Sequence, residues 1–268
     1  MSRIQTTFAQ LKQSGKKALI PYITAGDPHP KFTVELMHAM VKAGADMIEL
    51  GVPFSDPMAD GPVIQRASER AIRQGTNLDS VLQVAREIRE QSNAGIILFS
   101  YMNPILQFGI DRFCASVAAA GADGALVTDL PLEEAGDYLQ AMKGRRLAPV
   151  FLAAPTSTDE RLRAIARHSR GFVYAISRTG ITGTRHEVAG DARELVARLR
   201  KFTHLPIAVG FGISSPNQFS EVGTFADAAV IGSAIVQRVE ENPGREADAV
   251  LEFLSSVMGM KRQAEMAT

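Results

Sequence analysis

The stretch Asp46–Pro62, DMIELGVPFSDPMADGP, begins as a short apolar run and ends as a loop rich in proline and aspartate. An apolar run of this length predicts a buried strand, and the turn-forming residues after it predict where the strand ends. The run nevertheless contains an acid, Glu49, and a second acid, Asp60, follows in the loop. Burying a carboxylate without a partner is costly, so both acids need an explanation.

Short apolar runs of this kind recur along the whole chain, and amphipathic helical patterns separate them. Strand and helix in alternation predict right-handed crossovers and a parallel sheet. No Pro/Gly/Ser-rich linker divides the chain, so we predict a single α/β domain over residues 1–268, a (β/α)8 TIM barrel. The eight runs are ALIPYIT from Ala18, DMIEL from Asp46, GIILFSY from Gly95, DGALVTD from Asp123, APVFLAA from Ala148, GFVYAIS from Gly171, PIAVGF from Pro206 and DAAVIG from Asp227.

Some connections are longer than a single helix requires. After the second predicted strand, the segment PVIQRASERAIRQG precedes the helical pattern LDSVLQVAREIREQ. Pro62 opens that segment, at a position where a helix tolerates proline. We also predict an extra helix before the first strand and another in the connection after the eighth. An enlarged loop after a barrel strand is more often functional than decorative.

The composition indicates an ordinary globular protein. The 268 residues are 46% hydrophobic, and 29 basic residues balance 29 acidic ones, so the chain lacks the basic field that a nucleic-acid partner requires. The single cysteine, Cys114, excludes an intramolecular disulfide. No apolar run approaches the roughly 18 residues of a membrane span, and the N-terminal segment lacks the apolar core of a secretory signal. We therefore predict a cytoplasmic protein.

Position along a strand matters for each acid, because the active site of a (β/α)8 barrel lies at the carboxyl ends of the strands. Glu49 stands near such an end, where a lone acid either finds a partner or faces the barrel mouth. Asp46, Asp123 and Asp227 stand at strand starts, and we interpret them as turn residues. Asp60 lies in SDPMADGP, where turn formation alone explains it as well as function does.

Glycines follow the sixth, seventh and eighth predicted strands, where barrels commonly bind phosphate. Glycine lets the backbone approach an anion closely, and a helix that begins at Ser233 would present free N–H groups to it. Each glycine pair alone is weak evidence, because tight turns use the same residues. Together they predict a phosphate site formed by three loops, which contain Gly180, Thr182 and Gly183, then Gly210 and Gly212, and finally Gly232 and Ser233.

Residue types that are absent from the strand ends narrow the reaction class. No lysine stands at the carboxyl end of a predicted strand, which argues against a Schiff-base aldolase. The five histidines are scattered and no pair has metal-ligand spacing, which argues against a metal-dependent aldolase. Proton transfer by carboxylates, with binding energy from a phosphate group, is the chemistry that remains.

Five motifs in order closely resemble one known family, the tryptophan synthase alpha subunit. They are PYITAGDP, IELGVPFSDPMADGPVIQ, APTSTDERL, SRTGITG and GFGIS, and the resemblance extends from Pro21 to the helix after Ser233. It implies a (β/α)8 barrel that cleaves indole-3-glycerol phosphate to indole and glyceraldehyde 3-phosphate in tryptophan biosynthesis. The chain itself would need no cofactor, since pyridoxal phosphate belongs to the beta subunit. The resemblance also implies an α2β2 complex, with contacts to the beta subunit through Pro53, Asp56 and Pro57.

The same resemblance makes Glu49 and Asp60 the catalytic residues. Glu49 would move protons between C3 of indole and a glycerol hydroxyl, and Asp60 would accept the indole N–H and stabilise positive charge on the nitrogen. An apolar setting from Leu50, Tyr22 and Phe211 would raise the pKa of Glu49. Asp60, which is expected to be more solvated on its loop, should remain ionised.

The resemblance also assigns the substrate pocket. Thr182 would close over Glu49 when its loop folds down. For two of the lining residues, Leu126 and Leu152, ordinary barrel packing is nearly as good an explanation. The phosphate is expected at Gly183, Gly212, Gly232 and Ser233 beside Phe211, and the indole and glycerol parts at Tyr22, Phe99, Tyr101, Leu126, Leu152 and Tyr174.

Two other functions stay open at this point. A related phosphate-binding barrel, such as an isomerase of a phosphoribosyl compound, would share the glycines but would not require Glu49 and Asp60 together. A barrel that serves mainly as an allosteric binding subunit would have negligible turnover of its own. Indole release, measured with and without a beta subunit, separates the three hypotheses.

Overall fold

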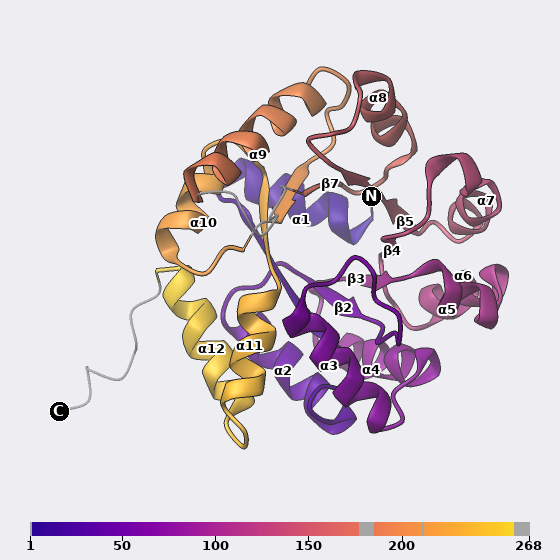
Figure 1. Ribbon diagram of the computed structural model, residues 1–268, viewed down its shortest axis with the longest axis vertical. Coiled ribbons are helices and arrows are strands. Elements are labelled where there is room, and N and C mark those ends of the chain that lie inside the picture. Colours follow the sequence, from indigo (N-terminus) through magenta and orange to yellow (C-terminus); the bar gives the residue numbers. More distant parts are fainter. Residues whose placement is uncertain (1, 177–184, 211, 260–268) are drawn as a thin grey trace.

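Within residues 2–176, 185–210 and 212–259, which the computed structural model describes, nine parallel strands form the centre and helices surround them (Figure 1). The strands pair in the order β5-β4-β3-β2-β1-β9-β8-β7-β6. Their bounds are β1 Ala18–Thr24, β2 Met47–Gly51, β3 Gly95–Ser100, β4 Gly124–Val127, β5 Ala148–Val150, β6 Leu152–Ala153, β7 Val173–Ile176, β8 Ile207–Gly210 and β9 Ala228–Ile231.

β5 and β6 are two parts of the run that the sequence predicts as one strand. Phe151 separates them, yet its carbonyl oxygen accepts the N–H of Tyr174 at 3.1 Å. Because β5 pairs with β4 and β6 pairs with β7, the interrupted strand joins the two halves of the sheet. The sheet is therefore a nearly closed barrel, and the predicted fold class is confirmed.

Side chains alternate between the barrel interior and the layer beneath the helices, as the two-residue period of a strand requires. On β2, Met47 belongs to the inner hydrophobic cluster, whereas Ile48 and Leu50 belong to the large outer cluster. Glu49 has the inward parity of Met47 and is 1% exposed. Leu50 points the other way, so the expectation that it helps to form the apolar setting of Glu49 is wrong.

The helices have the following bounds: α1 Arg3–Gln13, α2 Pro30–Lys42, α3 Pro62–Arg73, α4 Leu78–Gln91, α5 Met102–Phe108, α6 Ile110–Ala119, α7 Gly136–Gly144, α8 Asp159–His168, α9 Arg185–Leu199, α10 Pro216–Gly223, α11 Ser233–Glu241 and α12 Glu246–Val257, with a 3₁₀ turn at Leu132–Glu134. The extra helices predicted after the second and eighth strands are confirmed as α3 and α11, each followed by another helix. In the described part of the chain, no helix is both long and apolar enough to cross a membrane.

The sequence patterns do not predict α5, which lies ahead of α6 in the third connection. Seven residues, MNPILQF, are too few to establish a helical period, and a proline lies among them. By contrast, α3 has Pro62 in its first turn and α4 has Asn77 as a capping residue, which are signals that sequence does carry.

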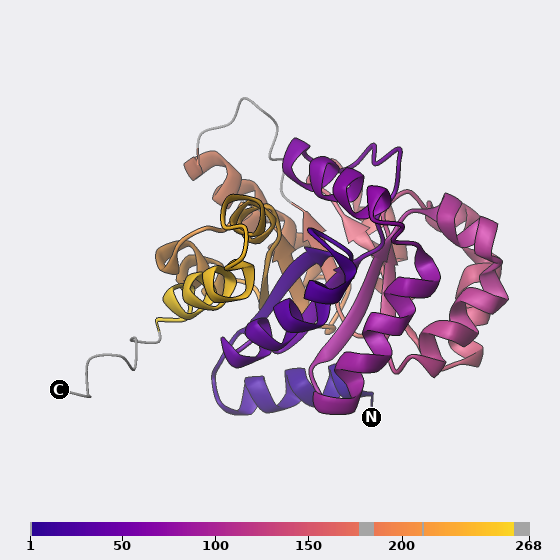
Figure 2. The ribbon, with the colours of Figure 1, turned by 90° about the horizontal axis from the view of Figure 1, so that it is seen from below.

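α1 lies across the lower end of the barrel, the end formed by the strand starts (Figure 2). Ile4 and Phe8 of this helix join the inner hydrophobic cluster and so close that end. Ser2 and Gln5 form a capping box that starts the helix. The extra N-terminal helix predicted from the sequence is thus confirmed, and the barrel interior is closed at this end.

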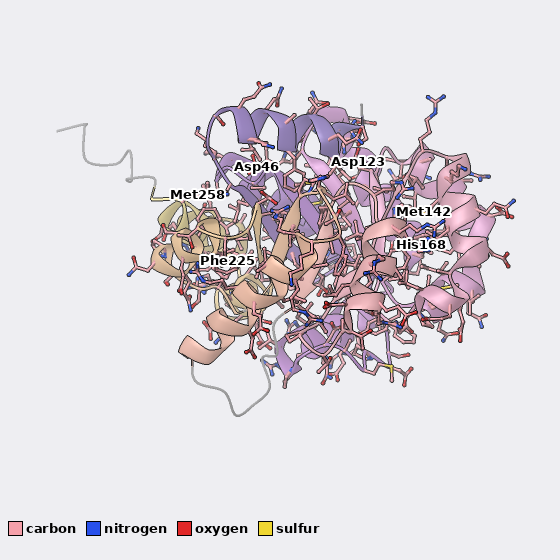
Figure 3. All side chains as sticks on the ribbon, turned by 90° about the horizontal axis from the view of Figure 1, so that it is seen from above. Asp46, Asp123, Met142, His168, Phe225 and Met258 are labelled. Atoms are coloured by element: carbon pink, nitrogen blue, oxygen red, sulfur yellow. The ribbon has the colours of Figure 1, made fainter. Side chains whose placement is uncertain are left out.

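Three aspartates at strand starts join neighbouring strands at the lower end. Two of them, Asp46 and Asp123, are seen beside α1 in Figure 3. Each carboxylate accepts a backbone N–H of the strand that precedes it: Asp46 from Leu19 at 2.9 Å, Asp123 from Ile96 at 2.9 Å and Asp227 from Ile207 at 2.8 Å. Their interpretation as structural residues at helix-to-strand turns is confirmed.

Candidate active site

Glu49 is buried at the upper end of the barrel, and one of its carboxyl oxygens, Oε1, has no hydrogen-bond donor among the described residues. Burial raises the pKa of Glu49 to about 8, because the ionised form would lose its hydration without compensation. The expected rise in pKa is confirmed. The carboxyl group holds its proton at neutral pH and can release it at little cost.

A cavity of about 150 Å³ opens at the same end and contains Glu49 in its wall. Strands β1, β2, β3 and β7 supply one part of the wall, and the residues that follow β8 and β9 supply another. The cavity therefore places a carboxyl group and a set of backbone N–H groups around one space. Its lining residues are Tyr22, Glu49, Ile64, Phe99, Tyr174, Gly210, Gly212, Ile213, Val230, Gly232, Ser233 and Ala234.

Tyr22 is the neighbour of Glu49 on the adjacent strand, in direct register with it. Its ring meets the ring of Phe99 edge to face, with the centroids 5.2 Å apart, and its hydroxyl lies 3.2 Å from the hydroxyl of Thr24. Gly51 makes room for this ring, since a Cβ atom there would overlap the Tyr22 hydroxyl. Packing thus holds Tyr22 and Phe99 as an aromatic wall beside Glu49.

Tyr174 forms another part of the wall, from β7. A Cβ atom at Gly210 would overlap its hydroxyl, so this glycine has a packing role in addition to its place in a predicted phosphate loop. Burial and the charge of Glu49 raise the pKa of Tyr174, which keeps the phenol protonated. The cavity therefore presents neutral aromatic surface to a ligand that reaches Glu49.

The glycine-rich part of the cavity has the features of an anion site. Gly212 has a φ of +34°, a conformation that side-chain-bearing residues rarely adopt, and a Cβ atom added there would meet open space. α11 begins at Ser233 after Gly232, without a side-chain cap. The Ile235 N–H is bonded to the Gly232 carbonyl oxygen at 2.8 Å, which leaves the N–H groups of Ser233 and Ala234 for an anion, and the helix dipole favours negative charge there.

Asp60 lies at the end of the loop after β2, directly before α3. The Tyr101 hydroxyl accepts the Ala59 N–H at 3.0 Å and lies near enough to the Asp60 carboxylate to stabilise its ionised form. Burial raises the pKa of Asp60 to about 6, with the Tyr101 hydroxyl opposing the rise. Asp60 is partly exposed whereas Glu49 is 1% exposed, so the expectation that Asp60 is the more solvated acid is confirmed. The expected ionisation still holds at neutral pH, which exceeds that pKa by about one unit.

Asp60 is not part of the cavity wall, although it lies near it. After burial, the charge of Asp60 is the largest cause that raises the pKa of Tyr22, which does line the cavity. The charge of Glu49 also raises the pKa of Tyr22. Since such an effect requires proximity, the Tyr22 hydroxyl lies near both acids. The two predicted acids thus approach the same region from a loop and from a strand.

Other predicted residues lie apart from this space or outside the described residues. Leu126 and Leu152 face inward within the inner cluster but do not line the cavity, as the packing alternative predicts. Thr182, Gly183 and Phe211, and with them Gly180, fall outside the described residues. No group of His, Cys, Asp or Glu side chains in the described ranges is arranged to hold a metal ion.

Ile64 is a cavity residue that the sequence reasoning missed. It belongs to the inner face of α3, where Ala67 and Ala71 are buried at helical spacing. Ala67 packs with Tyr22 and with Val236 of α11. The helical period of α3 predicts that one face of this helix is buried. It does not predict that this face covers the barrel mouth.

The loop between β2 and α3 begins with two buried residues, Val52 and Pro53, and continues with several accessible ones. Pro53 is buried, Pro57 is half-buried, and Asp56 is exposed with its carboxylate bound to the Ser55 hydroxyl at 2.6 Å. Met58 is 83% exposed, an unusual position for a large apolar side chain. The loop therefore offers an accessible surface next to Asp60.

Comparisons with known proteins identify the family. The family model described as the tryptophan synthase alpha chain matches residues 8–265. The tryptophan synthase alpha chain of Solibacter usitatus is 54% identical over 90% of this chain and 91% of its own length. That of Polynucleobacter necessarius is 49% identical over 94% and 96%.

Solved structures agree with this result. The tryptophan synthase subunit alpha of Legionella pneumophila has a TM-score of 0.90 and 39% identity, over 97% of this chain and 98% of that one. An open form of tryptophan synthase from M. tuberculosis with BRD0059 bound contains a chain with a TM-score of 0.89 and 35% identity, over 97% and 98%. This chain belongs to the tryptophan synthase alpha chain family.

Proposed function

We propose that this chain cleaves indole-3-glycerol phosphate to indole and glyceraldehyde 3-phosphate by a retro-aldol step that uses Glu49 and Asp60. Members of its family are lyases that catalyse this alpha reaction of tryptophan biosynthesis. They bind no cofactor, because pyridoxal phosphate belongs to the beta subunit. The observation that carries the roles of the residues is the unpartnered oxygen of Glu49 in the same cavity as the first turn of α11.

Glu49 performs the proton transfers in this proposal. A proton added to C3 of indole makes the ring a leaving group, and removal of the proton from the glycerol hydroxyl beside the bond drives its cleavage to an aldehyde. The neutral carboxyl group can supply the first proton and the resulting carboxylate can accept the second. A pKa of about 8 supports this role, since both forms are accessible near neutral pH.

Asp60 stabilises the charge that develops on the indole ring. Protonation at C3 leaves positive charge on the ring nitrogen, and a nearby carboxylate lowers the energy of that state. With a pKa of about 6, Asp60 is mostly ionised at neutral pH and can accept the indole N–H. The nearby Tyr101 hydroxyl supports the role by stabilising the ionised form.

The phosphate group binds at the opposite side of the cavity from the reacting bond. Gly212, Gly232 and Ser233 hold it, and the N–H groups of Ser233 and Ala234 at the start of α11 support this assignment. Further contacts are proposed at Gly183, Phe211 and Thr182. The proposed pocket for the indole and glycerol parts consists of Tyr22, Phe99 and Tyr174, which line the cavity, with Tyr101 near Asp60.

Members of the family pair with a beta subunit. For this chain we propose an α2β2 complex with contacts through Pro53, Asp56 and Pro57. The exposed Asp56 and Met58 support a docking surface on that loop. We further propose that residues 1–268 act as one domain in the cytoplasm, where a chain with a single cysteine needs no disulfide.

Indole release from indole-3-glycerol phosphate tests the proposal. We expect slow release by the chain alone and faster release with a beta subunit. Glu49→Gln should lower kcat by at least about 10³-fold and Asp60→Asn by about 10²-fold, with both variants folded. No indole release by the wild-type complex would reject the activity, and full turnover by Glu49→Gln would reject the proton-transfer role.

A further inference from the structure

An ion-pair network outside the cavity joins three elements at the upper end of the barrel. Arg70 of α3 donates from Nε and Nη2 to the two carboxylate oxygens of Asp27, at 2.7 and 2.9 Å. Its remaining nitrogen, Nη1, donates to Glu240 of α11 at 2.6 Å. One turn earlier on α3, Arg66 donates to both oxygens of Glu240 at 2.8 and 2.6 Å.

The contact between Arg70 and Asp27 is the buried part of this network. Asp27 follows β1 and its side chain is 4% exposed, whereas Arg66 is 49% exposed. A two-pronged contact between guanidinium and carboxylate is directional and strong, and removal of one partner would leave a buried charge unpaired. Burial raises the pKa of Asp27, and the hydrogen bonds from Arg70 oppose that rise.

The two helices held by this network both line the cavity of the proposed site. Ile64 and Ala234 line one cavity, Ala67 packs with Val236, and Arg70 reaches Glu240. α3 and α11 thus lie side by side (Figure 1), and because the residue numbers of these contacts rise along both helices, the two run in the same direction. These contacts fix the position of α3 against α11 and with it the part of α3 that lines the cavity.

Asp60 is attached to the start of α3. The Gln65 side-chain amide donates to the Asp60 carbonyl oxygen at 2.8 Å, and the Gln65 N–H donates to the Gly61 carbonyl oxygen at 3.0 Å. A shift of α3 along or about its axis would thus carry Asp60 with it. Ser233, at the start of α11, would not follow that shift.

We propose that Arg70 is a positioning residue for the cleavage step: by bridging Asp27 and Glu240 it fixes α3, and with it Asp60, relative to Glu49 and the anion-binding start of α11. This inference rests on the proposed function, because it assigns Asp60 a role at the reacting indole. Arg70 itself lies outside the cavity wall and touches no substrate.

The proposal predicts a change in kcat more than in KM. Phosphate binding depends on α11 and on the glycine loops, which keep their own contacts when Arg70 is replaced. Misplacement of Asp60 by a fraction of an ångström weakens an interaction that matters most in the transition state. Lysine cannot replace the arginine fully, because one ammonium group cannot grip both oxygens of Asp27 and reach Glu240 as well.

The test uses this chain assembled with a beta subunit and measures steady-state indole release. Arg70→Gln should lower kcat about 10- to 100-fold with KM changed less than about threefold. Arg70→Lys should restore part of the loss. The matched control is Arg66→Gln, which removes an equal charge one turn away on the same helix but leaves Asp27 paired, and it should change kcat by less than about twofold.

A double-mutant cycle with Asp60→Asn separates positioning from general stability. If Arg70 acts through Asp60, Arg70→Gln should lower kcat by less than about threefold when Asp60 is already Asn. A folded Arg70→Gln variant with wild-type kcat would overturn the proposal, and so would an equal loss in both backgrounds. Absence of indole release by the wild-type complex would instead reject the proposed function itself.

The pair Asp27→Asn and Arg70→Gln covers the case in which Arg70→Gln alone does not fold. Together they leave no buried charge unpaired, and two amides replace the ion pair. The proposal expects this double variant to fold and to show the same loss of kcat. Wild-type kcat in the double variant, or failure of the double variant to fold, would assign Arg70 to stability alone and overturn the proposal.

Discussion

The acids at the strand starts and Glu49 at the upper end of the barrel differ in whether their carboxyl groups find a hydrogen-bond partner. At the lower end, Asp46, Asp123 and Asp227 each accept a backbone N–H from the preceding strand. At the upper end, Glu49 leaves an oxygen without a partner among the described residues. The same chemical group therefore joins strands at one end and remains available at the other.

This difference teaches what an unsatisfied acid signifies. A buried acceptor without a partner costs stability, so folding alone gives no reason to place one there. Glu49 has this cost at the end of the barrel where strand termini and loops surround a cavity. Burial there raises the pKa of Glu49 to about 8. Satisfied acids at strand starts indicate structure, whereas the unsatisfied acid at a strand end indicates chemistry.

The largest expected effect that sharpens the comparison is a gain in stability from Glu49→Gln at high pH. The folded-state pKa of about 8 lies above the ordinary value of 4.5, so the folded protein binds more protons than the unfolded chain between these values. Wild-type stability should therefore fall as pH rises through this window, by up to about 1.4 kcal/mol per pH unit. Glu49→Gln lacks this loss.

Urea unfolding of both proteins from pH 4 to 9 measures the effect. The difference in the free energy of unfolding, variant minus wild type, should grow with pH and level off once Glu49 is ionised in both states. Glu133→Gln, a change at an acid that is 68% exposed, should give a difference that does not vary in this way. If the difference in the free energy of unfolding for Glu49→Gln does not change with pH, Glu49 destabilises the folded protein no more than an exposed acid does.

The next largest effect belongs to the lower end. Asp123 accepts the Ile96 N–H and pairs with Arg3 and with Arg89, and its side chain is 7% exposed. Asp123→Ala should lower the free energy of unfolding by about 2–3 kcal/mol, because three donors lose their acceptor. Turnover per folded molecule should stay at the wild-type level.

Asp79→Ala is the control for that variant, because Asp79 forms an exposed ion pair with Arg112 at 3.7 Å. Chemical unfolding and indole release should be measured on the same preparations. A loss of kcat in folded Asp123→Ala would break the comparison, since the lower end would then take part in the reaction.

The smallest effect concerns the anion side of the upper end. A Cβ atom at Gly232 would lie 3.6 Å from Tyr22, an ordinary contact, so Gly232→Ala should fold normally. The added methyl group would crowd the approach to the first turn of α11, and we expect KM to rise about three- to tenfold with little change in kcat. Gly136→Ala, which adds a methyl group in open space away from the cavity, should change neither constant.

Much of the fold was predictable because its signals are local. Strand runs that start at Ala18 or Asp46 bury side chains on both faces, and such runs are short, apolar and bounded by turns. α5 escaped prediction because its seven residues contain too few turns to show a period. The interruption at Phe151 also has no sequence signal that we can name.

The site was predictable only in part. An acid in an apolar run identifies Glu49 from sequence, and the two-residue period also places Leu50 on the opposite face, which the expected apolar setting overlooked. The pKa of Asp60 depends in part on Tyr101, which is 41 residues away in the chain. Ile64 and Arg70 become relevant only because α3 lies against α11 over the barrel mouth, and no periodicity reveals such long-range packing.

The most direct test of the central claim is the titration of the Glu49 carboxyl group itself. Protein labelled with ¹³C at the glutamate side-chain carboxyl, compared with Glu49→Gln to assign the signal, gives its midpoint by NMR. We predict a midpoint near pH 8, with the group neutral below it. A midpoint near the ordinary value of 4.5 would contradict the account, because Glu49 would then be a solvated or paired carboxylate without a proton to give.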